Sequence, residues 1–135
     1  SCEALPDDVI AWTGGRALVA TGSPFPDVHH DGRCHRIGQG NNAFIFPGVG
    51  LAVLAAGLRA VDDGMFLDAA HALASSVSAD ELQAGLLYPP IARLREVSRA
   101  IALAVLAGQG IEASRADALL ARATWTPRYV EYVPG

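Results

Sequence analysis

Apolar residues recur along most of the chain at the spacing of amphipathic helices. The clearest case is the segment from about Ile91 to Ala107, which Gly108 and Gly110 follow. Its apolar stripe has four members three or four residues apart: Leu94, Val97, Ile101 and Val105. Because this spacing places them on one face of a helix, the segment is predicted to be the longest helix and to pack on a core.

Five further helical segments are predicted from their apolar spacing and boundary residues. They run from Leu5 to Trp12, from Asn42 to about Leu58, from Asp63 to about Ser76, from Ser78 to Gly85 and from about Ser114 to Ala123. Ser78 and Glu81 have the spacing of a capping box. Pro47 delays or bends the second of these helices, because it cannot donate a hydrogen bond to Ala43.

Two short segments have the patterns of strands. Ala17 to Ala20 is a continuous apolar run, which is typical of a strand buried in a parallel sheet. Asp31-Gly32 lies at the centre of Val28 to His35, and this dipeptide is a strong signal for a tight hairpin turn. The sequence therefore predicts one buried strand and one small exposed hairpin.

The buried strand raises a question about domain organisation. A parallel strand inside a sheet needs neighbours on both sides, since its backbone donors and acceptors must be paired. No other segment of this sequence has the pattern of such a neighbour. Either the strand pairs with something outside these residues, or the sequence is one part of a larger α/β domain.

The composition narrows the class of protein. Of 135 residues, 51% are apolar and 18% are charged, so the chain can bury one core and is not intrinsically disordered. The net charge of −4 argues against nucleic acid as the main partner. Two cysteines are too few for a disulfide framework, and the acidic N-terminus differs from a signal peptide, so we expect a cytoplasmic protein. The uncharged segment from Ile37 to Leu58 contains several glycines and Pro47, which favours a core helix over a membrane span.

Two motifs suggest chemistry but have a simpler interpretation. Gly38 to Ala43 matches the dinucleotide pattern G-x-G-x-x-A, but a polar hairpin rather than a buried strand precedes it, which favours a loop and helix cap. The cluster of His29, His30, Cys34 and His35 suggests zinc. Across the hairpin, however, His29 faces Cys34 and His30 faces Arg33, which leaves at most two or three ligands on one face. An exposed polar hairpin is the favoured interpretation, and we assign no metal ligands.

Two loops are better candidates for a binding site. Asn41 and Asn42 lie at the start of a predicted helix, where they can cap the helix or bind a carboxylate or phosphate. Local patterns alone favour capping. Thr21 and Gly22 follow the carboxyl end of the predicted strand, which is where open α/β sheets place ligands, so the two loops can face one crevice.

Four segments resemble the NAD-dependent malic enzymes. They are Trp12 to Ala17, Ala20 to Phe25, Gly38 to Gly48 and Leu87 to Pro90, and the third reads Gly-Gln-Gly-Asn-Asn-Ala-Phe-Ile-Phe-Pro-Gly. The resemblance covers nearly the whole chain and is strongest from Cys2 to about Leu106. It implies an α/β fold in which residues 1–135 are the C-terminal half of a Rossmann-like NAD-binding domain, without a separate second domain. As an isolated chain this half is expected to be mostly helical, with one buried strand and a small β-hairpin.

The resemblance also implies an activity and its participants. It implies metal-dependent oxidative decarboxylation of L-malate to pyruvate and CO2, with NAD as hydride acceptor and Mg²⁺ or Mn²⁺ at the substrate. The expected partners are L-malate or pyruvate, NAD and the remainder of a malic enzyme chain, in a homo-oligomer. By similarity, Asn41 and Asn42 contact substrate, while Asn42, Thr21 and Gly22 contact the cofactor. The resemblance therefore reverses the local preference for capping alone.

The catalytic groups of the resembling family are not found here. In that family the base is a lysine, the acid is a tyrosine and the metal ligands are acids, all upstream of the matched region. This chain has no lysine, and Tyr88, Tyr129 and Tyr132 match none of the catalytic motifs. We therefore assign no catalytic residue and expect the isolated chain not to turn over malate. The alternative is an independent helical binding or interaction module derived from such a domain.

Overall fold

A computed structural model describes residues 3–125. The helices are α1 (Pro6–Trp12), α2 (Phe46–Ala56), α3 (Asp63–Ser75), α4 (Ala79–Gln83), α5 (Leu94–Gly108) and α6 (Ala113–Ala123), with 3₁₀ turns η1 (Asn42–Phe44) and η2 (Ile91–Arg93). The strands are β1 (Ala20–Thr21), β2 (Val28–His30), β3 (Arg33–His35) and β4 (Gly38–Gln39). The prediction of a mostly helical chain with a strand and a hairpin is confirmed. Tyr129 and Tyr132 lie outside the described residues.

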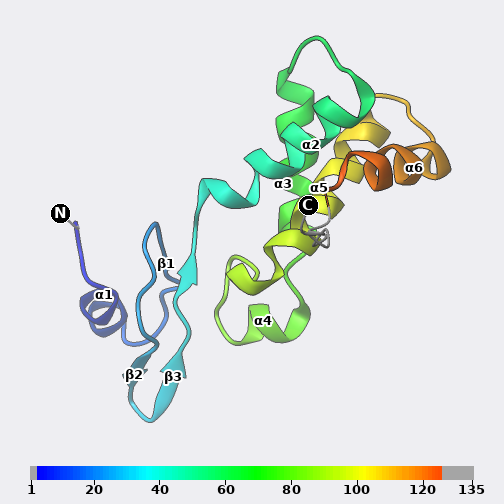
Figure 1. The fold of residues 1–135 in the computed structure, drawn as a ribbon. Helices are drawn as coiled ribbons and strands as arrows, with labels where there is room; N and C mark the ends of the chain where they lie inside the picture. Colours follow the sequence, from blue (N-terminus) through cyan, green and yellow to red (C-terminus); the bar gives the residue numbers. More distant parts are fainter. Residues whose placement is uncertain (1–2, 126–135) are drawn as a thin grey trace, which may run out of the picture.

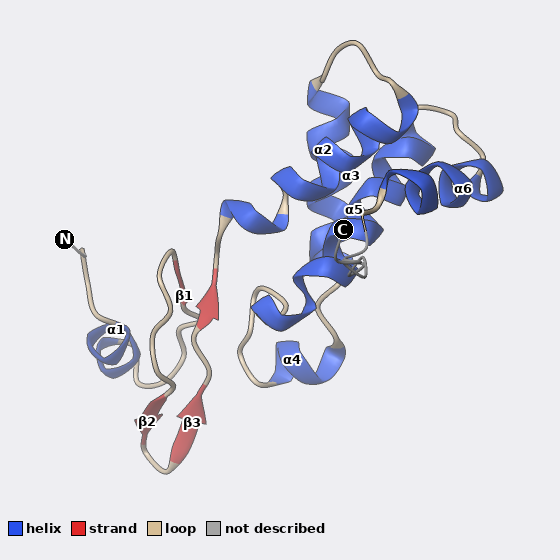
Figure 2. Ribbon diagram, in the orientation of Figure 1, coloured by secondary structure: helices blue, strands red, loops and turns tan. Residues whose placement is uncertain are grey.

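The elements form two groups along the molecule. Helix α1 and the four strands lie at one end, and helices α2, α3, α5 and α6 pack together at the other (Figure 1, Figure 2). The connection is a short stretch after β4 that leads through η1 into α2. No helix in the described part of the chain is long and apolar enough to cross a membrane.

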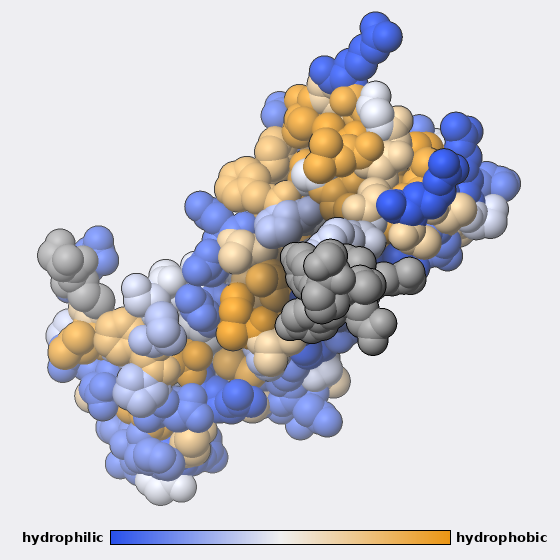
Figure 3. All heavy atoms as spheres, viewed as in Figure 1, coloured by the Kyte–Doolittle hydropathy of each residue, from blue (hydrophilic) through white to orange (hydrophobic). Residues whose placement is uncertain are grey.

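Large apolar side chains remain exposed on the helical group. Leu54 is 80% exposed, and Phe46, Phe66 and Leu67 are also exposed. Figure 3 shows apolar residues gathered over this end of the molecule. The rings of Phe46 and Phe66 meet edge to face with their centroids 6.4 Å apart, so they cover only part of each other.

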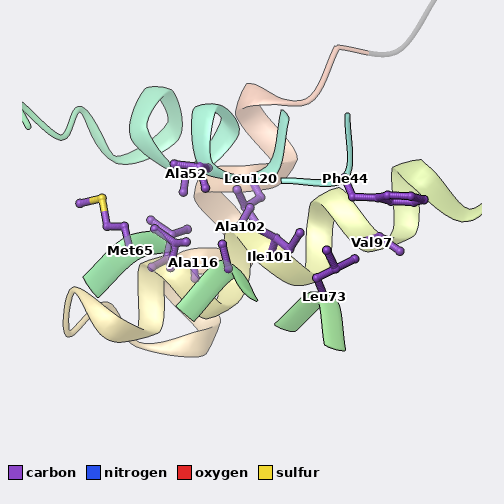
Figure 4. Close-up of a cluster of buried hydrophobic side chains, with 13 residues drawn as sticks. Phe44, Ala52, Met65, Leu73, Val97, Ile101, Ala102, Ala116 and Leu120 are labelled. Atoms are coloured by element: carbon purple, nitrogen blue, oxygen red, sulfur yellow. The ribbon is translucent and has the colours of Figure 1, made fainter. Parts of the chain in front are cut away.

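The core is built around α5. Its inner face carries Val97, Ile101 and Val105, which are fully buried as the predicted stripe requires, while Leu94 is half-buried at the edge. Helices α2, α3 and α6 all contact α5. Thirteen buried residues make up the cluster (Figure 4): Phe44, Val49, Ala52, Met65, Ala69, Leu73, Val97, Ile101, Ala102, Val105, Leu106, Ala116 and Leu120.

Gly48 allows α2 to approach α5 closely. A Cβ atom at this position would lie 2.6 Å from Ile101 Cγ2 and 2.8 Å from the carbonyl oxygen of Ser98. Both distances are shorter than real contacts, and one of the atoms belongs to the backbone of α5. The close approach of α2 to α5 therefore requires glycine, which has no side chain, at position 48.

The predicted strand differs from the observed one. Pairing begins at Ala20 rather than Ala17, and β1 runs parallel to β4 with Ala20 opposite Gly38. Leu18 is 58% exposed, so the expectation of a buried strand is wrong for the described structure. Side-chain exposure alternates from residue to residue between Ala17 and Ala20, because only one face of this segment is covered by the rest of the protein. The sequence also missed β4, whose two residues are too few to give a pattern.

The hairpin and the helix starts agree with the sequence. Asp31 and Gly32 have φ of 49° and 73°, as a two-residue hairpin turn requires, and His29 pairs with Cys34 as predicted. The regular helix α2 begins only at Phe46 because Pro47 occupies its first turn. The backbone N–H of Ser78 donates to Glu81 Oε2 over 2.8 Å, and the N–H of Glu81 donates back to Ser78 Oγ, which completes the predicted capping box.

Replacing Gly48 tests the contact between α2 and α5. Gly48→Ala should lower the free energy of unfolding by about 1–3 kcal/mol, because the new methyl group must displace Ile101 or the α5 backbone. Gly50→Ala is the matched control in the same helix, since nothing lies within 4 Å of its added Cβ. The control should stabilise the chain by about 0.5–1 kcal/mol through helix propensity. Chemical denaturation measures both, and equal effects of the two variants would contradict the packing argument.

Candidate binding site at the Asn41–Asn42 turn

The asparagine pair lies on a groove of about 480 Å³. The end of β4, the turn η1, one side of α3 and the segment before Pro89 form its walls. Its lining residues are Gly40, Asn41, Asn42, Ile45, Ala70, Leu73, Ala74, Leu87 and Tyr88. None of these nine is charged. The groove therefore offers carboxamides, one phenol and apolar surface to a ligand.

Asn41 caps the turn that it precedes. Its Oδ1 accepts a hydrogen bond of 2.9 Å from the N–H of Ala43, and its backbone carbonyl accepts from the N–H of Phe44. The predicted capping role is confirmed. The cap uses one lone pair of Oδ1, and the other polar group of the side chain, Nδ2, can only donate. A ligand that binds this group must therefore present an acceptor oxygen or nitrogen.

Asn42 is the first residue of η1 and is exposed. Its backbone carbonyl accepts from the N–H of Ile45, while its side chain makes no hydrogen bond within residues 3–125. Both the donor and the acceptor of this carboxamide are therefore available. In this pair, the Asn41 side chain is held by its hydrogen bond to the backbone, while the Asn42 side chain can change rotamer to meet a ligand.

Thr21 and Gly22 line a different hollow of about 800 Å³. The segment before α1, α1 itself, and the chain from just before β1 to the loop after it form this hollow. Its lining residues are Glu3, Ala4, Pro6, Val9, Val19, Ala20, Thr21, Gly22, Ser23 and Phe25. The hydroxyl of Thr21 donates to the carbonyl of Ser23 over 2.7 Å, so it can only accept from a ligand. The carbonyl of Gly22 accepts from Gln39 Nε2.

The two predicted loops are neighbours even though they line separate hollows. Thr21 pairs with Gln39 across the parallel strands, and the N–H of Gly40 donates to the Thr21 carbonyl over 2.9 Å. Asn41 follows directly. Both loops therefore leave the carboxyl ends of adjacent parallel strands, which is the edge of an α/β sheet where ligands bind.

The glycine pattern of this segment serves strand pairing. The N–H of Gly38 donates to the Val19 carbonyl, and the N–H of Gly40 is used in the same ladder. In a dinucleotide fingerprint the backbone approaches a pyrophosphate at a helix N-terminus. Here the glycine amides are already bonded, so they do not cradle phosphate, in agreement with the loop interpretation.

The histidine-rich hairpin has no metal-binding geometry. Within the described residues no group of three or more His, Cys, Asp or Glu side chains could hold a metal ion. His29 and Cys34 are exposed, and the rings of His30 and His35 have centroids 6.4 Å apart. His35 Nε2 is buried, has no hydrogen-bond partner among residues 3–125 and lies against Gly15.

Tyr88 and one face of α3 belong to the groove although sequence reasoning did not assign them to a site. The Tyr88 ring stacks on Phe44 with centroids 6.2 Å apart and an interplanar angle of 16°. Ala70, Leu73 and Ala74 of α3 line the same groove. Their spacing along α3 marks one helix face, but only the fold shows that this face meets the Asn41 turn.

Arg93, which follows Tyr88 by five residues, links this segment to α3, α4 and α5 through hydrogen bonds. Its Nη1 donates to the Ser76 carbonyl at the end of α3 and to both carboxylate oxygens of Glu81 in α4. Its Nε and Nη2 donate to Glu96 in α5. The pKa of Glu81 lies below its ordinary value of 4.5, mainly because its carboxylate accepts the hydrogen bond from the Ser78 N–H. The hydrogen bonds and positive charge of Arg93 lower this pKa further. The same guanidinium lowers the pKa of Glu96.

Comparison with known proteins identifies the family. Residues 1–109 match the family model described as the NAD-binding domain of malic enzyme. The chain belongs to the malic enzyme family. It is 44% identical to the NAD-dependent malic enzyme of Edwardsiella ictaluri, 41% identical to that of Acinetobacter baylyi and 43% identical to that of Vibrio parahaemolyticus. Each match covers 96% of this chain and 24% of the malic enzyme, so the chain spans about a quarter of the length of these relatives.

Substitution of Asn41 tests its role as a cap of the turn. Asn41→Ala removes the acceptor for the Ala43 N–H and should lower the free energy of unfolding by about 1 kcal/mol. Asn41→Asp keeps an acceptor oxygen and should retain most of this stability. Asn42→Ala, which leaves the cap intact, is the control and should change stability by less than about 0.5 kcal/mol. Thermal or chemical denaturation measures all three, and a stability loss for Asn42→Ala as large as that for Asn41→Ala would contradict the assigned cap.

The Glu81 interactions predict a pH dependence of stability. Because the pKa of Glu81 is lower in the folded state, its stabilisation is present above about pH 4.5 and is lost as the pH falls through the folded value. Glu81→Gln should therefore lower Tm at pH 7, and the difference from the unmodified chain should shrink below pH 4.5. Glu112→Gln, at an exposed carboxylate without an ion pair to the described residues, is the control. A Glu81→Gln difference that stays constant from pH 7 to pH 3 would refute this assignment.

Proposed function

We propose that this chain works as part of a malic enzyme that oxidatively decarboxylates L-malate to pyruvate and CO2 with reduction of NAD. Asn41 and Asn42 contact the substrate, and Asn42, Thr21 and Gly22 contact the cofactor. The observation that carries the proposal is the position of the asparagine pair. It lines a groove beside the carboxyl ends of two parallel strands, in a chain that matches a NAD-binding domain.

The free groups of the pair suit this reaction. Malate presents carboxylate and hydroxyl oxygens, all of which can accept a hydrogen bond, and Asn41 Nδ2 is restricted to donating. Asn42 can donate to the substrate and accept from a nicotinamide carboxamide at the same time. Since no lining residue of the groove is charged, positive charge for the two carboxylates must come from the remainder of the enzyme.

The residues described here do not fit a metal site. Mg²⁺ or Mn²⁺ requires several oxygen ligands, mainly carboxylates, and the described chain has no cluster of three such groups. We therefore assign the metal of the proposed reaction to other parts of a malic enzyme. The chain also has no lysine to act as general base. For both reasons we propose that the isolated chain does not turn over malate.

A graft tests the proposal. The 135 residues replace the matched quarter of the Edwardsiella ictaluri enzyme, and malate-dependent NAD reduction is measured at 340 nm in the chimaera and in the isolated chain. We expect an active chimaera and an inactive chain. Asn41→Ala and Asn42→Ala should each lower kcat/KM of the chimaera by about tenfold, the cost of one lost hydrogen bond to substrate or cofactor. Gln109→Ala, an exposed amide at the end of α5, is the matched control and should leave kcat/KM unchanged.

Different results would contradict different parts of the proposal. Malate-dependent NAD reduction by the isolated chain would refute its predicted inactivity. An active chimaera with unchanged kcat/KM in both asparagine variants would refute the role of the pair. An inactive chimaera, together with a cooperative melt of the isolated chain as a monomer, would favour the alternative of an independent helical module. The self-contained cluster around α5 is the observation that supports that alternative.

A further inference from the structure

Tyr88 lies at the junction between the Asn41–Asn42 turn and the helical core. Its ring is stacked almost parallel to Phe44, which is fully buried and is the last residue of η1. Asn42 is the first residue of the same 3₁₀ turn. A flat contact of this kind fixes the orientation of both rings, so it also restrains the short turn that carries Phe44.

The same ring also lies against the backbone before the pair. A Cβ atom at Gly40 would be 3.2 Å from Tyr88 Cε2 and 3.3 Å from Tyr88 Cζ, which is closer than most real contacts. Tyr88 therefore contacts the residue just before Asn41 and the residue two positions after Asn42. The two asparagines lie between these contacts.

Tyr88 is itself held in place from its C-terminal side. Pro89 and Pro90 follow it, and Pro89 is fully buried. A residue before proline is disfavoured in the helical region, so the backbone at Tyr88 has few alternatives. Beyond the prolines, Arg93 ties the segment to Glu81 and to the end of α3. The ring is thus a fixed wall of the groove.

We propose that Tyr88 is a positioning residue, whose ring holds the Asn41–Asn42 turn in the orientation that presents both carboxamides to the groove. The proposal rests on the function proposed above for the pair, and it assigns Tyr88 no contact with the reacting atoms. The ring acts through Gly40 and Phe44. The hydroxyl group is not needed for this role.

Hydrogen exchange in the 135-residue chain tests the local effect. The N–H groups of Ala43 and Phe44 donate hydrogen bonds within the turn, and that of Gly40 donates to the Thr21 carbonyl just before it, so their exchange rates report the order of this segment. Tyr88→Ala should raise these rates by about tenfold relative to the Val105 amide in α5. Tyr88→Phe should restore the rates of the unmodified chain. Leu82→Ala, at an exposed leucine of α4, is the control and should change none of them.

Three results would overturn the proposal. Unchanged rates in Tyr88→Ala would show that the ring does not restrain the turn. An equal rise at Val105 would show a general loss of the core. Loss of protection in Tyr88→Phe would assign the effect to the hydroxyl group rather than the ring.

A double-mutant cycle in the chimaera then tests the link to turnover. If Tyr88 acts through the pair, Tyr88→Ala should lower kcat about tenfold in the chimaera with both asparagines and much less in a background that carries Asn41→Ala together with Asn42→Ala. Tyr88→Phe should restore kcat. An effect of Tyr88→Ala that is equally large in both backgrounds would refute a role exerted through the pair. An inactive chimaera would instead count against the proposed function, while the exchange rates would still decide whether Tyr88 positions the turn.

Discussion

The contact between α2 and α5 at Gly48 determines where the candidate site lies. Helix α2 begins one 3₁₀ turn after the asparagine pair, so its placement fixes that of the turn. Because no side chain separates Gly48 from Ile101 and the Ser98 carbonyl, the two helices lie close together and bury Phe44 beneath them. Tyr88 can then stack on Phe44 and close the wall of the groove. The geometry of a polar site thus depends on an apolar contact between two helices.

Local patterns predicted the helices and the hairpin because their determinants lie within a few residues. The stripe on α5, the capping box of Ser78 and Glu81, and the Asp31-Gly32 turn all depend on neighbours in sequence. The pairing of β1 with β4 depends on residues far apart, and two-residue strands have no periodicity to read. For that reason the sequence missed the partner of the strand and overestimated its burial.

The candidate site could be predicted in part for the same reason. Asn41 and Asn42 are predictable because a pair of carboxamides before a helix is a local signal and because the surrounding run resembles the malic enzymes. The walls of the groove come from α3 and from the segment of Tyr88, which meet the turn only through tertiary packing. Nothing in the order of residues indicated that the Thr21 loop and the asparagine turn would line separate hollows.

The exposed apolar residues agree with a chain that spans a quarter of its relatives. Leu54, Phe46 and Phe66 lie on the outer side of a helical group that already has a complete core. Contiguous apolar surface of this kind usually marks contact with another protein segment. Leu18, next to β1, is a second exposed apolar site at the other end of the molecule. Both agree with the proposal that the chain works inside a longer malic enzyme polypeptide.

Capping by Asn41 and the ligand contact proposed for it are cooperative rather than competing roles. The bond from the Ala43 N–H to Oδ1 fixes the side chain before any ligand arrives, so little rotational freedom remains to be lost on binding. The same bond fixes which end of the carboxamide faces the backbone, so Nδ2 donates in a fixed direction. A side chain that was free in the unbound protein would bind the same oxygen more weakly, because it would have to be ordered first. The local preference for a cap and the resemblance to substrate-binding asparagines therefore describe the same structural feature.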